Sequence, residues 1–451
     1  MSAPRLVSLL GLGFGDCGKG LFTDALCRRW SAHSVVRFNG GAQAGHNVVL
    51  PDGRHHTFSQ FGAGTLVPGV ATVLAAPVVV HPTALLVEEA QLRAIGVNDA
   101  LAGLHIDRRC RINTPFHQAA GRLRELRRGS AAHGSCGVGV GETVRHALQH
   151  PEQVLYYGDL ARPALAMQKL EAIRHRLLGE FAAAPESESD QAMAEYQLLT
   201  DEQAGERWLA ATMPLLRQVA PASPEQLSTH LHRPGCVIFE GAQGVLLDEW
   251  HGFHPHTTWS SITPTAVEAV AANYGLGPRI EHLGILRAYL TRHGQGPLPT
   301  ADAALNHLPE PHNSDQGWQG KFRRGHPDGV LLRYALAVVG QLDGLLLSHL
   351  DIFARGTSLR WCEAYLAPRG ENDAQLCHRP AASDAQIKEL RRGPPHDLTH
   401  QAALSQLLSA AIPVYDTIPI TSADALIERL TTFSRCPLIL GSHGPSHLDA
   451  R

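Results

Sequence analysis

The chain has 451 residues, 44% of them hydrophobic, and a formal net charge of −3 at pH 7. This length predicts a large core, in one big α/β domain or in two ordinary ones. The balanced charge argues against a nucleic-acid partner, and no apolar run approaches the roughly 20 residues of a membrane span. The N-terminus is interrupted by glycine too early for a signal peptide, so we expect a soluble, cytoplasmic protein.

The predicted elements alternate between strands and helices along the chain. Residues 5–13 form a short apolar strand, residues 19–30 have helical spacing, and residues 34–41 form a second strand. Later apolar runs that each end at a polar or glycine-containing loop occupy 71–81, 235–244, 281–292, 342–353 and 435–445. Helical stretches separate them, for example 329–342 and 421–433. This alternation predicts a large, mostly parallel, twisted sheet covered by helices, with functional groups where the strands end.

Two segments interrupt the alternation without dividing the chain. Residues 181–197 are predicted to be an exposed helix-to-helix insert, and residues 368–400, rich in Pro, Arg, Asp and His, an irregular layer. Apolar strands resume after both segments, so neither is a linker between independent domains. We therefore expect a single domain over residues 1–451.

The stretch LGLGFGDCGKGL at residues 10–21 fits two glycine fingerprints, G-x-G-x-x-G of dinucleotide turns and G-x-x-x-x-G-K of phosphate loops. A dinucleotide turn requires an acid about 20 positions later, and the second strand ends in VVRFNGG without one. Lys19 therefore favours a phosphate cradle, with Gly20 where a Mg²⁺-binding Ser or Thr is usual. Asp16 supplies a carboxylate that can replace this hydroxyl as a hard oxygen ligand.

Further segments follow the glycine loop in the order and spacing of one known family. They are VVRFNGGAQAGHNVV (35–49), FEGAQGVLLDEWHGFHPHTTWSS (239–261), GILRAYLTRHGQGPLPT (284–300), PVYDTIP (413–419) and GSHGP (441–445). Over nearly the whole chain they resemble adenylosuccinate synthetases, most specifically in NGG-x-x-AGH and FEGAQG-x-LLD. The resemblance implies the P-loop-like adenylosuccinate synthetase fold. It also implies a GTP- and Mg²⁺-dependent ligase of purine biosynthesis that joins aspartate to inosine monophosphate.

The resemblance also implies roles for individual residues. Asp16 is implied as the base that removes the proton at N1 and as a Mg²⁺ ligand, with the carbonyl of Gly45 as a second ligand. His46 is implied as the general acid at O6, because the 6-oxo group must be phosphorylated before an amine displaces it. The implied binding residues are Gly15, Gly18, Lys19, Gly20, Asp351, Ser442, Gly444 and Pro445 for GTP, Gln43, Ser135, Cys136, Gln243 and Thr258 for the nucleotide substrate, and Arg323 and Arg324 for aspartate. An arginine lent by a second subunit falls near Arg145 or His150, which implies a two-fold homodimer.

Several positions depart from the family pattern. They are Cys17 for Glu and Leu21 for Lys in the opening loop, Cys136 for Thr and Val138 for Arg in GSCGVGVG (134–141), Lys321 and Phe322 within the arginine run, and His349 for Lys before Asp351. One lost polar or charged contact commonly costs about 1.5–3 kcal/mol. The losses together favour a divergent paralogue that acts on another 6-oxopurine nucleotide, another oxo-heterocycle or another amine.

Two other classes of function are alternatives to a ligase. A GTP-binding regulator without ligase activity is disfavoured by Asp16 and His46, because sensing GTP needs neither. A phosphate-loop kinase is disfavoured by Gly20 and by the absence of an arginine-rich lid segment in the sequence. The viral branch that aminates deoxyguanylate shares GKGL with this chain but lacks the opening-loop aspartate.

Overall fold

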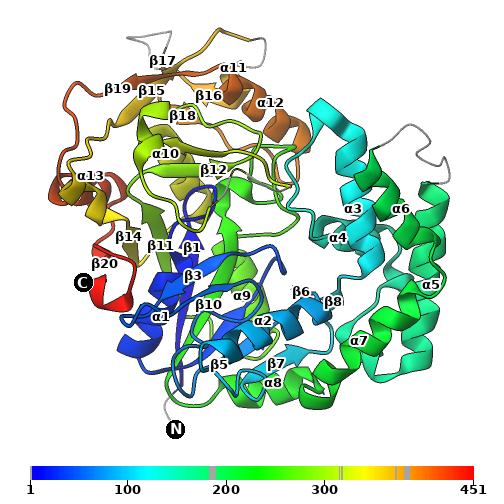
Figure 1. Cartoon of the computed structure of the whole chain (residues 1–451). Coiled ribbons are helices and arrows are strands. Elements are labelled where there is room, and N and C mark those ends of the chain that lie inside the picture. Colours follow the sequence, from blue (N-terminus) through cyan, green and yellow to red (C-terminus); the bar gives the residue numbers. More distant parts are fainter. Residues whose placement is uncertain (1–2, 182–188, 314, 316–317, 371–372, 380–385) are drawn as a thin grey trace.

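A nine-stranded sheet forms the centre of the computed structural model, which describes residues 3–181, 189–313, 315, 318–370, 373–379 and 386–451 (Figure 1). The strand order is β20-β14-β11-β1-β10-β2-β5-β7-β9, and all neighbouring strands are parallel. The strands are β1 (Arg5–Gly11), β2 (Ala32–Arg37), β5 (Ala71–Leu74), β7 (Leu104–Asp107), β9 (Pro221–Ala222), β10 (Cys236–Gly244), β11 (Glu281–Arg287), β14 (Gly344–Ser348) and β20 (Leu438–Gly441). The predicted parallel α/β sheet is confirmed.

Helices surround the sheet and extend from it. They are α1 (Lys19–Arg29), α2 (Pro82–Ala94), α3 (Pro115–Arg128), α4 (Val140–Gln149), α5 (Pro163–Glu180), α6 (Asp190–Thr200), α7 (Ala204–Gln218), α8 (Pro224–Leu231), α9 (Pro264–Ala272), α10 (Gly329–Val339), α11 (Asp373–Leu376), α12 (Leu398–Ser409) and α13 (Ala423–Ser434). Helices α3 to α7 lie together beside the sheet (Figure 1). Within the part of the chain that the structure describes, none of the helices is long and apolar enough to cross a membrane.

Strand β1 shows why the sheet requires helices on both faces. Its side chains alternate between two buried clusters: Val7 and Leu9 join the cluster that contains Leu21 and Phe22 of α1. Leu6 and Leu10 join the other cluster, which contains apolar side chains of α8, α9 and α10. Successive residues of a strand point to opposite faces, so an uninterrupted apolar run has to be covered on both.

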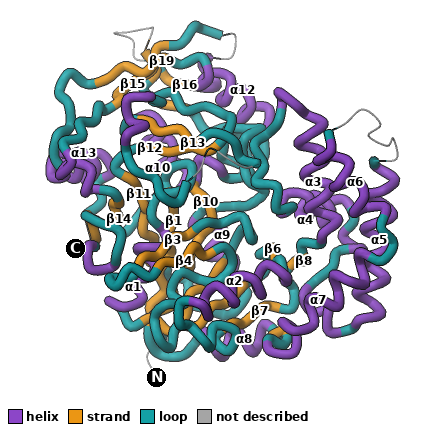
Figure 2. The backbone as a smooth tube through the Cα atoms, in the orientation of Figure 1, coloured by secondary structure: helices purple, strands orange, loops and turns teal. Residues whose placement is uncertain are grey.

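Small strand pairs and loops lie around the main sheet, and several of them lie beyond its carboxyl end (Figure 2). The pairs are β3 (His46–Val49) with β4 (His55–Phe58), β6 (Val79–Val80) with β8 (Arg111–Ile112), β12 (Leu290–His293) with β13 (Phe322–Gly325), and β16 (Cys377–His378) with β18 (Glu389–Leu390). A three-stranded sheet combines β15 (Cys362–Leu366), β17 (Gln386–Ile387) and β19 (Ile412–Tyr415).

Three predicted strands end earlier than the apolar pattern does. Residues 281–292 divide into β11 and β12, and β12 leaves the main sheet to pair antiparallel with β13. Residues 71–81 divide into β5 and β6, with Pro77, which has no amide proton for a sheet ladder, between them. In 342–353, β14 is followed by the 3₁₀ helix η6 (Leu350–Arg355).

The two predicted interruptions are described in part. In 181–197 the structure describes Phe181, which is buried after α5, and the first turns of α6, whereas residues 182–188 lie outside the described residues. In 368–400 the described residues form the short elements α11, β16, β17 and β18, whereas residues 371–372 and 380–385 lie outside them. The prediction of a single domain remains a prediction.

A histidine cluster at one side of the sheet makes stability depend on pH. The rings of His105 and His230 lie 4.2 Å apart, and those of His33 and His230 6.2 Å apart. Arg233 Nη2 and Ser34 Oγ lie 3.1 and 3.0 Å from His230 Nε2. Burial, followed by repulsion from His105, Arg233 and His33 where these groups carry a proton, lowers the pKa of His230 to about 3.

We expect His230→Gln to weaken the acid sensitivity of the fold. The unfolded histidine titrates near pH 6.5, so protonation favours the unfolded chain, and stability falls as pH drops below that value. Between pH 7.5 and pH 5, the variant should lose about 1 kcal/mol less unfolding free energy than the unsubstituted chain, after allowance for partial exposure. Urea unfolding at both pH values measures this, with the exposed His307→Gln as control. Equal losses in all three proteins would contradict the prediction.

Candidate active site

One cavity of about 1260 Å³ opens at the carboxyl ends of the parallel strands. Its wall includes these predicted site residues: Gly15, Asp16, Gly18, Lys19, Gly20, Gln43, Gly45, His46, Ser135, Cys136, Gln243, Thr258, Asp351, Ser442, Gly444 and Pro445. Arg323 and Arg324 do not line it. In open parallel sheets, ligands bind in this position, so the fold gathers segments that are distant in sequence into one candidate site.

The glycine loop between β1 and α1 is shaped by left-handed backbone at Gly15, Asp16 and Gly18, where φ is 106°, 45° and 92°. It passes so close to β10 that a Cβ atom at Gly244 would lie 2.2 Å from the Gly13 carbonyl oxygen. Lys19, the first residue of α1, is buried and donates from Nζ to the Gln243 carbonyl at 2.7 Å. The loop therefore presents the N-terminus of α1 and one ammonium group to the cavity, an arrangement that suits phosphate.

Gly20 is a glycine because β3 crosses the start of α1. A Cβ atom at Gly20 would lie 2.5 Å from the carbonyl oxygen of Asn47 and 2.8 Å from the carbonyl carbon of His46. Both neighbours are backbone atoms of β3, which cannot turn aside as a side chain can. The hydroxyl of an ordinary phosphate loop is thus excluded by packing.

We expect Gly20→Ser to lower stability and turnover, although it restores the usual phosphate-loop residue. Overpacking of this kind typically costs about 1–3 kcal/mol, and the displaced strand carries His46. Urea unfolding and a turnover assay measure the two effects. Gly277→Ser is the control, because no atom lies within 4 Å of a Cβ placed there. A Gly20→Ser protein as stable and active as the control would contradict the packing argument.

Asp16 is held at its carboxylate and at its carbonyl. His293 Nε2 lies 3.3 Å from Asp16 Oδ2, and Arg287 Nη1 donates to the Asp16 carbonyl at 3.2 Å. Burial raises the pKa of Asp16, but the hydrogen bond and charge of His293, with Arg287 and Lys19, outweigh burial and hold the pKa below its ordinary value. Asp16 is therefore ionised at neutral pH and has the charge that a base or a metal ligand requires.

His46 is oriented by a buried carboxylate. Its Nδ1 lies 2.8 Å from Glu240 Oε1, while its buried Nε2 has no partner among the described side chains and backbone. Burial lowers the pKa of His46 to about 4 against the opposing effect of Glu240. Glu240 stays ionised, because His46 and Arg37 outweigh the effect of burial on its pKa. The imidazole is thus neutral, with a proton on Nδ1 and a free lone pair on Nε2.

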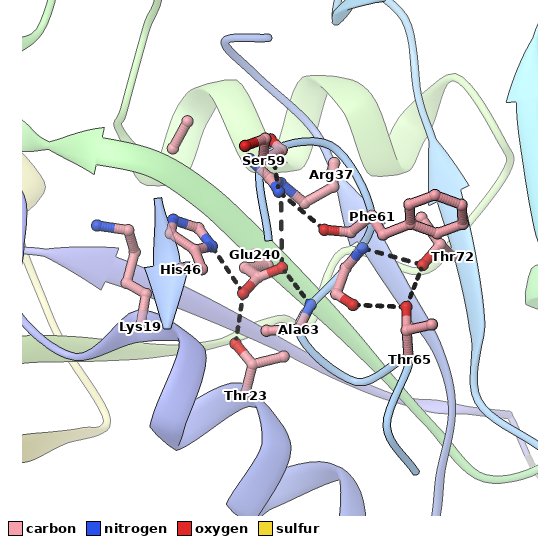
Figure 3. A network of polar contacts seen from close by, with 12 residues as sticks. Lys19, Thr23, Arg37, His46, Ser59, Phe61, Ala63, Thr65, Thr72 and Glu240 are labelled. Carbon is pink, nitrogen blue, oxygen red and sulfur yellow. Dashed lines mark hydrogen bonds and ion pairs between the residues drawn. The ribbon is translucent and has the colours of Figure 1, made fainter. Parts of the chain in front are cut away.

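Glu240 links this imidazole to the core of the sheet. Thr23 Oγ1 donates to Glu240 Oε1 at 3.0 Å, and the Ala63 amide donates to Oε2, also at 3.0 Å. The guanidinium of Arg37 lies 3.9 Å from Oε2. Figure 3 shows Glu240 at the centre of these contacts, with Lys19 on the far side of the His46 ring. The network fixes the position of His46 before any ligand binds.

Two glutamines lie where the nucleotide substrate is predicted. Both amide atoms of Gln43 are buried and lack hydrogen-bond partners within the described chain. Gln243 has left-handed backbone, with φ of 67°, at the end of β10. A buried amide without partners costs free energy, so Gln43 is a polar group prepared for a ligand.

The loop at 133–137 is held by an internal carboxylate. Glu125 Oε2 accepts from the amides of His133, Gly134 and Ser135 at 3.0, 3.1 and 3.3 Å. Burial raises the pKa of Cys136, so this residue presents a neutral thiol to the cavity. Ser135 and Cys136 lie on the cavity wall, and Arg122 Nε donates to the Gly137 carbonyl of the same loop at 2.9 Å.

The segments predicted to bind guanine meet at the other end of the cavity. The Leu350 amide donates to the Ser442 carbonyl at 2.9 Å, which joins η6 to the loop after β20. Asp351 pairs with Arg355 at 3.1 Å in a partly exposed ion pair. Such a pair is worth about 0–1 kcal/mol, so donors of a ligand can replace Arg355 at little cost.

The predicted aspartate arginines point elsewhere in the structure. Arg323 Nη2 donates to the carbonyls of Gly294 and Gly296 at 2.7 and 2.8 Å, and Arg324 Nη2 donates to Leu308 at 3.0 Å. Arg292 lines the cavity instead and packs over the Phe14 ring at 4.1 Å. Burial, with Arg323 nearby, lowers the pKa of Arg292 to about 9. The aspartate-binding role of Arg323 and Arg324 remains a prediction.

The cavity supplies few metal ligands of its own. Within the described ranges, no group of three or more His, Cys, Asp or Glu side chains is arranged to hold a metal ion. Asp16 and Gly45 line the same wall and offer a carboxylate and a carbonyl oxygen. Mg²⁺ typically takes one or two carboxylates and completes its shell with phosphates and water, so this donor set fits it.

Sequence reasoning missed His293, Arg287, Arg292 and Glu240. All four lie inside matched segments, GILRAYLTRHGQGPLPT and FEGAQG, but nothing local assigns them a role. A charged or imidazole side chain that interrupts an apolar strand is the signal available for Glu240 and Arg287, because such residues are rarely buried without a partner.

Comparison with known proteins gives matches over nearly the whole chain. A family model described as adenylosuccinate synthetase matches residues 8–447. The adenylosuccinate synthetase of Thioalkalivibrio sulfidiphilus is 34% identical over 389 residues, 84% of each chain. That of Azotobacter vinelandii is 31% identical over 434 residues, 92% of this chain and 96% of the relative.

Two solved structures share the fold. Fully ligated adenylosuccinate synthetase from Plasmodium falciparum has a TM-score of 0.78 at 20% identity, over 99% of both chains. Succinoaminodeoxyadenylate synthetase of cyanophage S-2L, bound to dGMP and to dATP as energy donor, has a TM-score of 0.59 at 16% identity. That match covers 100% of this chain and 95% of the phage protein. These likenesses confirm the fold that the sequence predicts.

Proposed function

The chain belongs to the adenylosuccinate synthetase family of GTP-dependent ligases, and we propose that it activates the 6-oxo group of a purine nucleotide for amination. The γ-phosphoryl group of GTP is transferred to O6, which leaves GDP. An amine nitrogen then bonds to C6, and phosphate departs with the original oxygen. With inosine monophosphate and aspartate the product is adenylosuccinate. The observation that carries this proposal is the meeting of Asp16, His46 and Lys19 on one cavity wall.

Asp16 and His46 divide the proton chemistry between them. The ionised Asp16 removes the proton from N1, which concentrates charge on O6 and makes it nucleophilic. His46 stabilises O6 and the transferring phosphoryl group as a general acid. Proton transfers of this kind each contribute about 10²–10⁴ in rate.

The acid role of His46 requires a second proton on its ring. In the free site Nδ1 donates to Glu240 and Nε2 holds a lone pair, so the neutral ring has no proton for O6. Phosphate groups beside Lys19 bring negative charge close to the ring and raise its pKa. Glu240 stabilises the imidazolium that forms. Binding of GTP thus converts His46 from an acceptor into a donor.

Phosphoryl transfer otherwise depends on positioning and charge. The amides at the start of α1 and the ammonium of Lys19 hold the phosphates of GTP, and Asp351 accepts hydrogen bonds from guanine. Ser442, Gly444 and Pro445 complete the guanine pocket. Asp16 and the Gly45 carbonyl would hold Mg²⁺, which would supply positive charge to the phosphate oxygens.

This proposal leaves alternatives for two of the substrates, the acceptor nucleotide and the amine. Gln43, Ser135, Cys136, Gln243 and Thr258 hold the acceptor, and Cys136 has replaced a hydroxyl. The alternative acceptors are another 6-oxopurine nucleotide and another oxo-heterocycle. The resemblance assigns Arg323 and Arg324 to the amine site, although both side chains donate to main-chain carbonyls in this structure. The alternative to aspartate is another amine.

The proposal includes a two-fold homodimer in the cytoplasm. It is supported by the family's shared active site, in which the lent arginine corresponds to the region of Arg145 and His150. Arg145 lines the cavity, where it pairs with Glu142 and Glu180 at 2.9 and 3.0 Å. Sedimentation equilibrium tests the dimer, and a monomer at micromolar concentration would contradict it.

A substrate panel tests the reaction. The protein is incubated with GTP, Mg²⁺, one amine and one nucleotide, and both phosphate and the C–N product are measured. We expect phosphate release only in the presence of a particular nucleotide and amine, in equal amount to the new product. Phosphate release without a product would instead favour a GTP-binding regulator.

A further inference from the structure

Asp16 is part of a closed ring of contacts, which we call the Asp16 ring. Its members are Asp16, Arg287, Glu310, Asn313 and His293. Arg287 donates to the Asp16 carbonyl at 3.2 Å and pairs with Glu310, and Asn313 Nδ2 donates to Glu310 Oε2 at 3.0 Å. Asn313 Oδ1 lies 3.2 Å from His293 Nε2, which lies 3.3 Å from Asp16 Oδ2. The ring joins the glycine loop to β11, β12 and the 309–313 loop.

The ring holds a residue in an unusual conformation. Asp16 has φ of 45°, a left-handed value that costs a residue with a Cβ atom free energy unless its surroundings maintain it. Arg287 and Glu310 are buried, with side chains 5% and 7% exposed, so this part of the ring is rigid. His293 is the member that contacts the carboxylate itself.

The contacts of His293 determine which nitrogen carries the proton. Asp16 Oδ2 and Asn313 Oδ1 are both acceptors, and both face Nε2, so Nε2 is the donor. Nδ1 is buried without a partner in the described part of the chain. The imidazole of His293 packs against the phenyl ring of Phe322, and the centroids of these two side chains lie 4.8 Å apart.

We infer that His293 is a positioning residue, which holds Oδ2 of Asp16 and thereby fixes the orientation of this carboxylate toward the acceptor. This inference rests on the proposed function, because it gives His293 a role only if Asp16 acts on the acceptor. A carboxylate without this contact can rotate about its last bond, and each misplacement reduces the fraction of complexes that react. His293 thus acts on the reaction through Asp16 and touches no reacting atom.

Three substitutions of His293 distinguish the role of its Nε2 from that of its Nδ1. A glutamine amide places a donor near Nε2, an asparagine amide places one near Nδ1, and leucine removes both. We expect His293→Leu to lower kcat by about 10–100-fold, with KM for GTP changed by less than about threefold. His293→Gln should recover most of this loss and His293→Asn should not. His307→Leu, an exposed histidine outside the cavity, is the control for the substitution itself.

The assay uses GTP, Mg²⁺, and the amine and nucleotide that give the highest rate in the substrate panel. In the Asp16→Asn background, His293→Leu should cause no further loss, because it acts through that carboxylate. Crystals of His293→Leu should show the Asp16 carboxylate rotated from its position in the unsubstituted protein. This structural result needs no substrate.

Four results would overturn the inference: unchanged kcat in His293→Leu, recovery by Asn in place of Gln, losses that multiply in the double variant, or an unmoved Asp16 carboxylate in the crystal. A failure of the proposed function looks different. In that case Asp16→Asn alone would keep its turnover, whereas failure of the inference leaves Asp16→Asn inactive and His293→Leu active.

Discussion

Replacement of Asp16 by asparagine is expected to lower turnover by about 10²–10⁴-fold while the fold persists. The amide cannot accept the N1 proton, so O6 remains a poor nucleophile towards the γ-phosphoryl group. It also lacks the negative charge that Mg²⁺ prefers in an oxygen ligand. Stability should change little, because the carboxylate is partly exposed and its contact with His293 can be kept by the amide oxygen.

The measurement is product formation at saturating GTP, together with urea unfolding. Asp52→Asn is the matched control, because Asp52 is an exposed carboxylate that bonds to Arg54 in the turn between β3 and β4. Its turnover should equal that of the unsubstituted protein. Turnover of Asp16→Asn within about fivefold of this control would show that the base is a different residue.

Glu240→Gln is expected to reduce both stability and turnover. Glu240 is fully buried and accepts from His46, Thr23 and the Ala63 amide, while Arg37 lies 3.9 Å away. Removing one charge from a buried pair typically costs about 3–5 kcal/mol, because the other charge stays buried without compensation. The NH₂ group of the glutamine would also face donors that now bond to a carboxylate oxygen, and two donors cannot hydrogen-bond to each other. His46 then loses the carboxylate that orients it, and turnover should fall by about 10²-fold.

Urea unfolding at pH 7.5 and product formation measure these two losses. Glu281→Gln is the control, because Glu281 begins β11 and forms a partly exposed ion pair with Arg5 at 2.7 Å. Surface pairs of this kind are worth about 0–1 kcal/mol. If Glu240→Gln lowers the free energy of unfolding and the turnover no more than Glu281→Gln does, the buried network does not hold His46 as described.

The sheet and the glycine loop could be predicted because their signals are local. Continuous apolar runs mark buried parallel strands, and the spacing of glycines with Lys19 marks a loop at a helix N-terminus. The hairpin of β12 and β13 could not be predicted from such runs. Leu290–His293 continues the apolar pattern of β11, and only its pairing with Phe322–Gly325, about 30 residues later, removes it from the main sheet.

The residues of the site also differ in whether a local motif or only a distant contact identifies them. Asp16 and His46 stand in recognisable motifs, whereas their partners His293 and Glu240 are separated from them by 277 and 194 residues. No local pattern reports such contacts. Arg323 shows that a local motif does not by itself place a side chain. The motif contains this arginine, but the pairing of β13 with β12 directs its side chain to the carbonyls of Gly294 and Gly296.

The central claim is that the 6-oxo oxygen itself becomes the departing phosphate oxygen. The most direct test uses an acceptor nucleotide with a heavy oxygen isotope at this position, together with unlabelled GTP and water. The released phosphate, analysed by mass spectrometry, should carry one heavy oxygen for each molecule of aminated product. Unlabelled phosphate formed alongside product would contradict the account, because the oxygen would then have left C6 by another route.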